Sequence, residues 1–221
     1  MTVLVPPGAQ ANINCAVEGF SLSATIGGTP QVMTATVATP SVADGDVVVT
    51  VTAVGLATGT KDVTVTVKDK DTVEAVAALL AAALEDDDDV GAFFDVGVAG
   101  AVVTLTRKTH TAVDNTMALA VKTDASSTGV TVTSAITVQG ALASSTTITL
   151  TPEVTYAAVP VLVGHPQHVK DAGSAATSMS WAITSQAKTG VTITVTLDQA
   201  PGAGKTDTIV FNGGLIGVPA R

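Results

Sequence analysis

The sequence is poor in charged residues, in aromatic residues and in cysteine. Charged residues make up 13% of the 221 residues and aromatic residues 3%, whereas 46% are apolar. An apolar fraction this high excludes a disordered chain of the polar, highly charged kind. The single cysteine, Cys15, excludes an intramolecular disulfide and a cysteine zinc site. The net charge of −9 argues against a nucleic-acid partner, because affinity for phosphate requires clustered Lys and Arg.

Long apolar segments are also missing. The longest strictly apolar run spans residues 75–84, about half of the roughly 20 residues that a membrane-spanning helix needs. Residues 1–8 lack the basic region and the apolar stretch of a signal peptide. We therefore expect no membrane partner and no secretory leader.

The chain is instead dominated by Thr, Val and Ala, and its mean hydropathy is positive, +0.48. A free monomer usually carries charge on about a quarter or more of its surface residues. Either a Thr-rich sheet covers the surface with hydroxyl groups, or much of the surface is buried against copies of the chain or other proteins. The low charge favours assembly.

β-Branched residues recur with period two in many segments, which predicts strands. The clearest are residues 47–54 and 62–68, joined by a hairpin loop at 55–61. Further strands are predicted at 93–98, 101–107, 117–122 and 130–138, with a turn at 97–100, and then at 147–151, 155–163, 178–184, 191–197 and 207–211.

One segment has helical periodicity instead. Asp71 and Glu74 have the spacing of a capping box, and alanines with high helix propensity follow. The apolar residues that share one helical face are Val73, Val76, Ala77, Leu80 and Leu84. We predict a helix over residues 71–84 that packs this face on a sheet. It ends before the acidic run, because carboxylates at a helix C-terminus oppose its dipole.

Together these elements predict a mainly β protein in three parts. Residues 41–140 form an α+β module with one helix on a sheet, and residues 141–221 form an antiparallel β-sandwich. The Ser-, Thr- and Ala-rich stretch 139–147 is the predicted linker between them. Residues 1–40, interrupted by Pro and Gly, are an N-terminal arm or extra strands.

Two segments resemble ligand-binding motifs without having their full patterns. Gly202–Thr206 matches the end of a phosphate-binding loop, which also needs a glycine at position 199 and a following helix. Position 199 is Gln and a strand follows, so we predict a hairpin turn. The carboxylates of Asp86–Asp89 are contiguous and lack the alternation and closing Glu of a calcium loop, so we predict a solvated acidic loop.

The histidines do not form an evident metal site. His165 and His168 lie three residues apart, but Pro166 argues against the helix in which they could share a metal. His110 is remote in the sequence. We therefore expect no metal and no cofactor.

Other reactive or aromatic residues are equally isolated. Cys15 lacks the local signature of a nucleophile. Trp181 and Tyr156 lie on predicted strands, where they pack in the core or, alternatively, form a platform on which a sugar stacks. No catalytic residue is assigned, and we expect a protein that is not an enzyme.

The module around the predicted helix resembles a family of virion proteins. Residues 62–84 join a Val/Thr strand to an Ala-rich helix, residues 98–107 contain a Val-Val-Thr-Leu-Thr strand, and residues 114–119 read Asp-Asn-Thr-Met-Ala-Leu. This order is similar to a module of tail sheath and related structural proteins of tailed phages. The resemblance covers about 60 residues and implies a structural role in a virion.

A second resemblance covers residues 155–217. A Val-Pro-Val strand at 159–161, a Thr-Gly strand start at Gly190 and an Ile-Gly ending at Gly217 are similar to the trimeric β-sandwich domains of phage fibres, which carry a Pro-x-Val strand, and to the H-type lectin-like fold. Val191 stands where those domains often carry Phe. This resemblance implies a homotrimer and a place at the particle surface.

The sequence therefore predicts a non-enzymatic structural component of a tailed-phage virion. We expect a self-associating capsid decoration or short fibre-like surface protein, made in the host cytoplasm and bound to itself and to other virion proteins. One alternative is a component of the tail, neck or baseplate. Another is a carbohydrate-binding host-attachment protein that works through the C-terminal domain.

Overall fold

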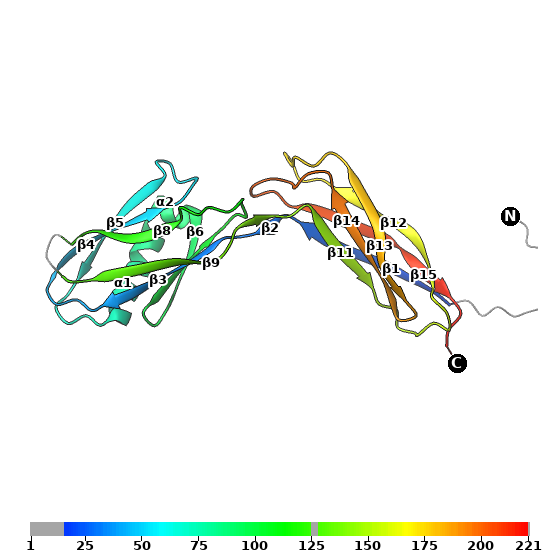
Figure 1. Cartoon of the computed structure of the whole chain (residues 1–221), viewed down its shortest axis with the longest axis horizontal. Coiled ribbons are helices and arrows are strands. Elements are labelled where there is room, and N and C mark those ends of the chain that lie inside the picture. The colour runs from blue at the N-terminus through cyan, green and yellow to red at the C-terminus, as the bar shows by residue number, and fades with distance from the viewer. Residues whose placement is uncertain (1–15, 125–127, 221) are drawn as a thin grey trace, which may run out of the picture. The chain divides into compact units, whose positions relative to one another are not determined.

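The computed structural model describes residues 16–124 and 128–220, and the candidate nucleophile Cys15 lies outside them. These residues are mostly β, with 55% in strands and 10% in helices, and the sheets are antiparallel, which confirms the predicted fold class. The chain divides into two compact units (Figure 1). Unit 1 contains the described parts of 1–26 and 206–221 together with Ser144–Pro201, and unit 2 contains Gly27–Ala143 and Gly202–Lys205.

Unit 2 contains two main sheets. One has the strand order β6-β7-β3-β9 and the other β5-β4-β8, and a short pair of β2 and β10 lies apart from both. The bounds are β2 Gly28–Thr29, β3 Val32–Thr39, β4 Gly45–Thr52, β5 Thr60–Val67, β6 Phe94–Ala99, β7 Val102–Arg107, β8 Ala118–Asp124, β9 Thr131–Val138 and β10 Ala141–Leu142.

The hairpins of unit 2 follow the period-two pattern. β4 pairs with β5 as an antiparallel hairpin, as the sequence predicted, but the pairing ends at Thr52 and Thr60, so the loop lies two residues before the predicted 55–61. The turn between β6 and β7 is tighter than predicted, because pairing continues to Ala99 and Val102. Gly97 therefore lies within β6, and Gly100, with φ 57°, supplies the left-handed conformation that the turn needs.

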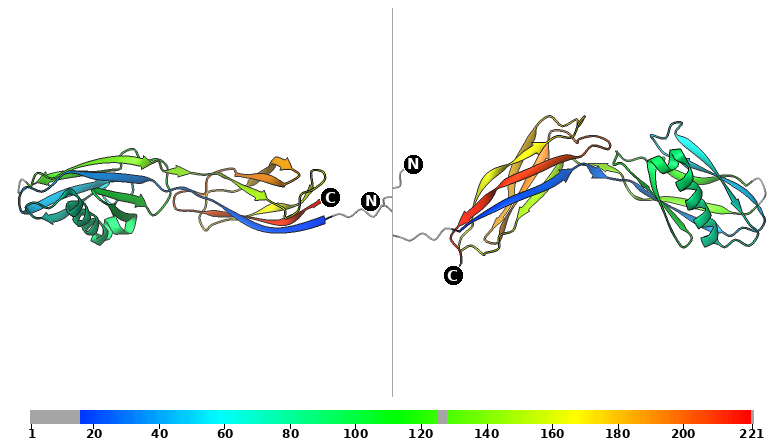
Figure 2. Two further views of the ribbon diagram at one scale, coloured as in Figure 1. Left: turned by 90° about the horizontal axis from the view of Figure 1, so that it is seen from below. Right: turned by 180° about the vertical axis from the view of Figure 1, so that it is seen from behind.

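Helix α1 spans Val73–Asp86 and packs against strands of both sheets of unit 2 (Figure 2). Its predicted face is buried at Val76, Ala77, Leu80 and Leu84, and Val73 is half-buried at the margin. The cap differs from the prediction.

Thr72 rather than Asp71 caps this helix. The Thr72 hydroxyl accepts a hydrogen bond from the Ala75 N–H at 3.3 Å. The Asp71 carboxylate instead accepts from the Lys68 N–H at 2.7 Å, one turn earlier in the chain. A side chain already used in that turn is not free to cap the helix.

The acidic run is not the solvated loop that the sequence predicted. Asp86 is the last residue of α1, and Asp87 caps a second helix, α2, which spans Asp88–Phe93. The Asp87 carboxylate accepts from the N–H groups of Asp89 and Val90, both at 3.1 Å. Carboxylates oppose the dipole at the end of one helix but stabilise the start of the next, so the same residues separate two helices.

Unit 1 is a sandwich of two three-stranded antiparallel sheets, which we call sheet A and sheet B. Sheet A has the order β1-β15-β12 and sheet B the order β11-β14-β13. The bounds are β1 Ala16–Ile26, β11 Ser145–Leu150, β12 Val161–Val169, β13 Met179–Ala187, β14 Gly190–Leu197 and β15 Asp207–Gly217. Between the sheets lie the fully buried Ile193, Val195, Ile209, Phe211 and Leu215.

The unit boundaries differ from the predicted parts 1–40, 41–140 and 141–221. β1 pairs along its whole length with β15 in unit 1, whereas β3 lies inside a sheet of unit 2. The stretch 139–147 is also more than a linker, because β10 and the start of β11 occupy it. Pairing partners nearly 200 residues apart leave no local signal, so periodicity could not assign β1 to its sheet.

Two further predictions need correction, one in unit 1 and one in the connection from β14 to β15. The strand expected at 155–163 begins at Val161, and Tyr156 instead forms an isolated bridge with Pro219 and is fully buried. The segment Gly202–Thr206 does not close a hairpin. It lies in the connection from β14 of sheet B to β15 of sheet A, so the strands that flank it belong to different sheets.

Candidate assembly surface

The outer face of sheet A is an uncharged surface. Its residues form rows across the three strands, and the residue of β15 in each row pairs with one of β1 and one of β12. From one end the rows are Val17, Ile216, Val161; Gly19, Gly214, Val163; Ser21, Asn212, His165; Ser23, Val210, Gln167; and Thr25, Thr208, Val169. None of these described residues is Asp, Glu, Lys or Arg.

The first rows of this face are the most apolar. Val17 and Val161 are 68% and 63% exposed and flank Ile216, and Val163 is also exposed. The second row has glycine on two of its three strands, so few side chains stand between the two rows and solvent. Exposed apolar rows without charge are the kind of surface that proteins often bury against a partner.

The outer face of sheet B is uncharged as well, but it is covered with hydroxyl groups. Its rows are Ser145, Thr196, Ser180; Thr147, Thr194, Ala182; and Thr149, Thr192, Ser185. The hydroxyls of Thr149 and Thr192 lie 3.2 Å apart, and those of Thr184 and Thr194 lie 3.0 Å apart. The two sheets of the sandwich therefore differ: sheet A exposes an apolar, uncharged face and sheet B a face rich in hydroxyl groups.

β13 exposes residues that belong to the core layer. Trp181 pairs with Val195 and Ile183 with Ile193, and directly paired residues point to the same face of a sheet. Val195 and Ile193 are fully buried, yet Trp181 and Ile183 are 40% and 43% exposed. The inner layer of the sandwich thus continues beyond the part that sheet A covers.

The charges of unit 1 lie mainly in its connections. Lys170 and Asp171 follow β12, Lys188 lies between β13 and β14, and Asp198 follows β14. Asp198 accepts hydrogen bonds from Thr177, Ser178 and Gln199, which hold its pKa well below the usual range. It joins the start of β13 to the end of β14 and is ionised at neutral pH.

His165 and His168 point to opposite faces of β12. They are three residues apart on a strand, where side chains alternate, so His165 lies on the outer face of sheet A and His168 on the inner face. Across the described residues, no three His, Cys, Asp or Glu side chains gather closely enough to bind a metal. The two histidines therefore do not form a shared site.

His168 belongs to a buried polar cluster around Asp207. Its Nε2 lies 2.7 Å from the Asp207 carboxylate, which also accepts from the Ser174 hydroxyl at 2.8 Å and from the Asp171 N–H at 2.7 Å. Burial alone would raise the pKa of Asp207, but these hydrogen bonds and the nearby histidine outweigh it and lower the pKa. Ser174 and His168 both bind the carboxylate, so the cluster lacks the serine–histidine contact of a catalytic triad.

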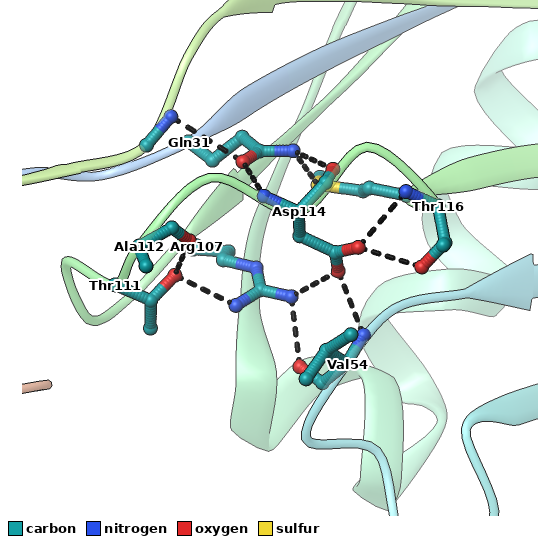
Figure 3. Close-up of polar contacts among 9 residues, drawn as sticks. Gln31, Val54, Arg107, Thr111, Ala112, Asp114 and Thr116 are labelled. Atoms are coloured by element: carbon teal, nitrogen blue, oxygen red, sulfur yellow. Dashed lines mark hydrogen bonds and ion pairs between the residues drawn. The ribbon is translucent and has the colours of Figure 1, made fainter.

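Unit 2 contains a buried ion pair that sequence reasoning missed (Figure 3). Arg107, the last residue of β7, and Asp114, in the loop before β8, are each 2% exposed at the side chain and lie 2.6 Å apart. The Arg107 guanidinium also donates to the Val54 carbonyl and the Thr111 hydroxyl and lies 5.0 Å from the ring centre of Phe93.

The Asp114 carboxylate is fully engaged. It accepts from the Val54 N–H at 2.7 Å and from the N–H and hydroxyl of Thr116 at 2.9 and 2.6 Å, besides Arg107. Burial raises the pKa of Asp114. The hydrogen bonds from Thr116 and Val54 and the charge of Arg107 lower it by more, so the pKa lies below the ordinary value. A carboxylate held in this way cannot accept a proton near neutral pH, and we assign the pair a structural role.

The backbone of this loop is held from the other side by Gln31. Its Oε1 accepts from the Asp114 N–H at 2.9 Å, and its Nε2 donates to the Asp114 carbonyl at 2.6 Å (Figure 3). A cavity of about 350 Å³ beside Arg107 is lined largely by apolar residues, among them Val113 and Ala203. The charged residues that line it, Arg107 and Asp114, are bound to each other, and its hydroxyl groups are those of Thr109 and Thr111.

The remaining sequence motifs do not form sites. No helix follows Gly202–Thr206, so this segment lacks the helix N-terminus that binds phosphate. No helix among the described residues is both long enough and apolar enough to cross a bilayer. Compared with models of protein families and with curated protein sequences, the chain matches none.

Proposed function

We propose that this chain is a non-enzymatic structural component of a tailed-phage virion, a self-associating capsid decoration or short fibre-like surface protein. The observation that carries the proposal is the absence of charged residues from both described outer faces of the unit 1 sandwich. The apolar outer face of sheet A is costly to leave in water, and uncharged faces of this kind are suited to burial between proteins.

The resemblances to phage proteins supply the virion part of the proposal. Residues 62–119 resemble a module of tail sheath and related proteins, and residues 155–217 resemble the trimeric sandwich domains of fibres. A closed oligomer of unit 1, with a homotrimer as the form that the second resemblance implies, would cover uncharged faces without leaving open edges. Other virion proteins would contact the faces that self-association leaves free.

The copy number in purified particles tests this function. Quantitative mass spectrometry of the particle should find hundreds of copies for a decoration protein, and tens or fewer for an attachment protein. A chain that is expressed during infection but missing from the particle would overturn the proposal.

Carbohydrate binding is a second candidate because Trp181 exposes part of its ring on β13. Glycan-array binding by the full chain, lost in Trp181→Ala with the fold intact, would support an attachment protein. Absence of binding on the array, with copy numbers in the hundreds, would favour decoration.

A further inference from the structure

β13 is an edge strand that lacks protective residues, and its one irregularity is a register shift between Ile183 and Ser185. It has one neighbour, β14, and Met179–Ala187 contains no charged residue, no proline and no glycine. Edge strands of soluble proteins usually carry such residues because the free backbone otherwise pairs with another strand. β12, an edge strand of sheet A, does carry such residues. Pro166 lies within it, and Gly164 has φ 120°.

The inward-facing side chains of β13 are also incompletely buried. Trp181 and Ile183 continue the buried row of Val195 and Ile193, but about two-fifths of each side chain is exposed. One further strand beside β13 would cover both side chains and pair the free backbone. The question is which strand fits.

We propose that the strand is β13 of a second copy of this chain, antiparallel and related by a two-fold axis at Ala182. This inference rests on the self-association in the proposed function. About that axis Trp181 lies opposite the second copy's Ile183, and Ser180 lies opposite its Thr184. Aromatic–β-branched and hydroxyl–hydroxyl pairs are both favourable across strands, so β13 is complementary to itself in this register.

Charge also favours a second copy in this orientation. Two chains of net charge −9 repel each other, but β13 and its neighbours in the central row, Thr194 and Thr147, carry no charge. The antiparallel alignment brings Lys188, just after one β13, toward Asp198, which is hydrogen-bonded to Thr177 and Ser178 at the start of the other. Opposite charges therefore meet at both ends of the contact.

The contact is short, so the dimer should depend on concentration. Regular pairing of β13 with β14 is interrupted between Ile183 and Ser185, which limits the flat part of the strand to residues near Ala182. Five residues of strand span about 17 Å, and an interface of that length is smaller than a standard stable one. We expect dissociation in the micromolar range.

Charge substitutions on the full chain test the contact. In Ala182→Lys two like charges would lie directly opposite each other on the axis, and light scattering should show a monomer at concentrations where the wild type is a dimer. Thr147→Lys is the matched control, because Thr147 is exposed in the same row on the other edge of sheet B. A mixture of Ala182→Lys and Ala182→Glu should dimerise again.

Cross-linking tests the register. In a Cys15→Ser background, Ala182→Cys should oxidise to a covalent dimer, since Cα atoms of directly opposed residues lie within reach of a disulfide. Thr147→Cys should not.

The outcomes separate this contact from self-association in general. A wild-type trimer, or a dimer that Ala182→Lys leaves intact, would overturn the β13 contact and leave the proposed self-association standing. A wild-type monomer throughout the micromolar range would overturn both.

Discussion

Replacing Asp114 by Asn should destabilise unit 2 by several kcal/mol. The Asp114 carboxylate accepts four hydrogen bonds, and the amide oxygen of Asn can keep the two from Thr116. Its amide nitrogen is a donor and cannot accept from Val54 and Arg107, which leaves a guanidinium 2% exposed without a counter-charge. Breaking a buried pair on one side costs about 3–5 kcal/mol, a large part of the stability of a domain.

Denaturation followed with two probes measures the effect. The one tryptophan and the one tyrosine, Trp181 and Tyr156, both lie in unit 1, so fluorescence follows unit 1 and circular dichroism follows both units. We expect the Asp114→Asn variant to show an early transition by circular dichroism that fluorescence does not match. Asp95→Asn, at an exposed contact of 3.9 Å with Lys108, is the control and should cost less than about 1 kcal/mol. If both variants unfold within about 1 kcal/mol of the wild type, the structural role of the pair is wrong.

Three further predictions concern the helices and the buried acids. Leu80→Asp places a carboxylate in the core beneath α1 and should lower the thermal midpoint by many degrees, whereas Leu79→Asp, on the exposed side, should leave it nearly unchanged. Asp87→Ala removes the cap of α2 and the 3.2 Å contact with Lys61, and urea titration should show a loss of about 1 kcal/mol in stability. Neutralising Asp86 or Asp88 should cost little, and equal effects at all three positions would refute the cap. The pKa of Asp207 is lowered in the folded state, so its stabilisation of unit 1 is complete above pH 3.8 and is lost as the pH falls through the lower folded value. Asp207→Asn should therefore flatten the acid side of the curve of stability against pH, measured by fluorescence.

Local patterns predicted local structure well. Alternating Val and Thr located β4, β5, β7 and β14 within a few residues, and the spacing of Val76, Leu80 and Leu84 identified the buried face of α1. The acidic run was misread as a solvated loop because carboxylates oppose the dipole at the end of one helix, and a helix of six residues is too short to show a helical period.

Non-local features were beyond the sequence. Arg107 and Asp114 are seven residues apart, but the carbonyl and N–H of Val54 that complete their cluster come from a distant part of the chain. The low charge of the sandwich could be read from composition, yet its location on both outer faces depends on the register of β1, β15 and β12.

The pairing of β2 with β10 shortens the effective loop that joins β1 to β11 in unit 1. The Ala143 N–H donates to the Gly27 carbonyl at 3.1 Å, so the two ends of the long excursion from Gly27 to Ala143 are held side by side. Once unit 2 has folded, the link between β1 and β11 behaves as a tight turn. If unit 2 unfolds, the same link becomes a loose loop of roughly 120 residues, whose closure costs about 4 kcal/mol of entropy. Unfolding of unit 2 therefore lowers the stability of the sandwich without unfolding it, so the Asp114→Asn variant should still show two separate transitions.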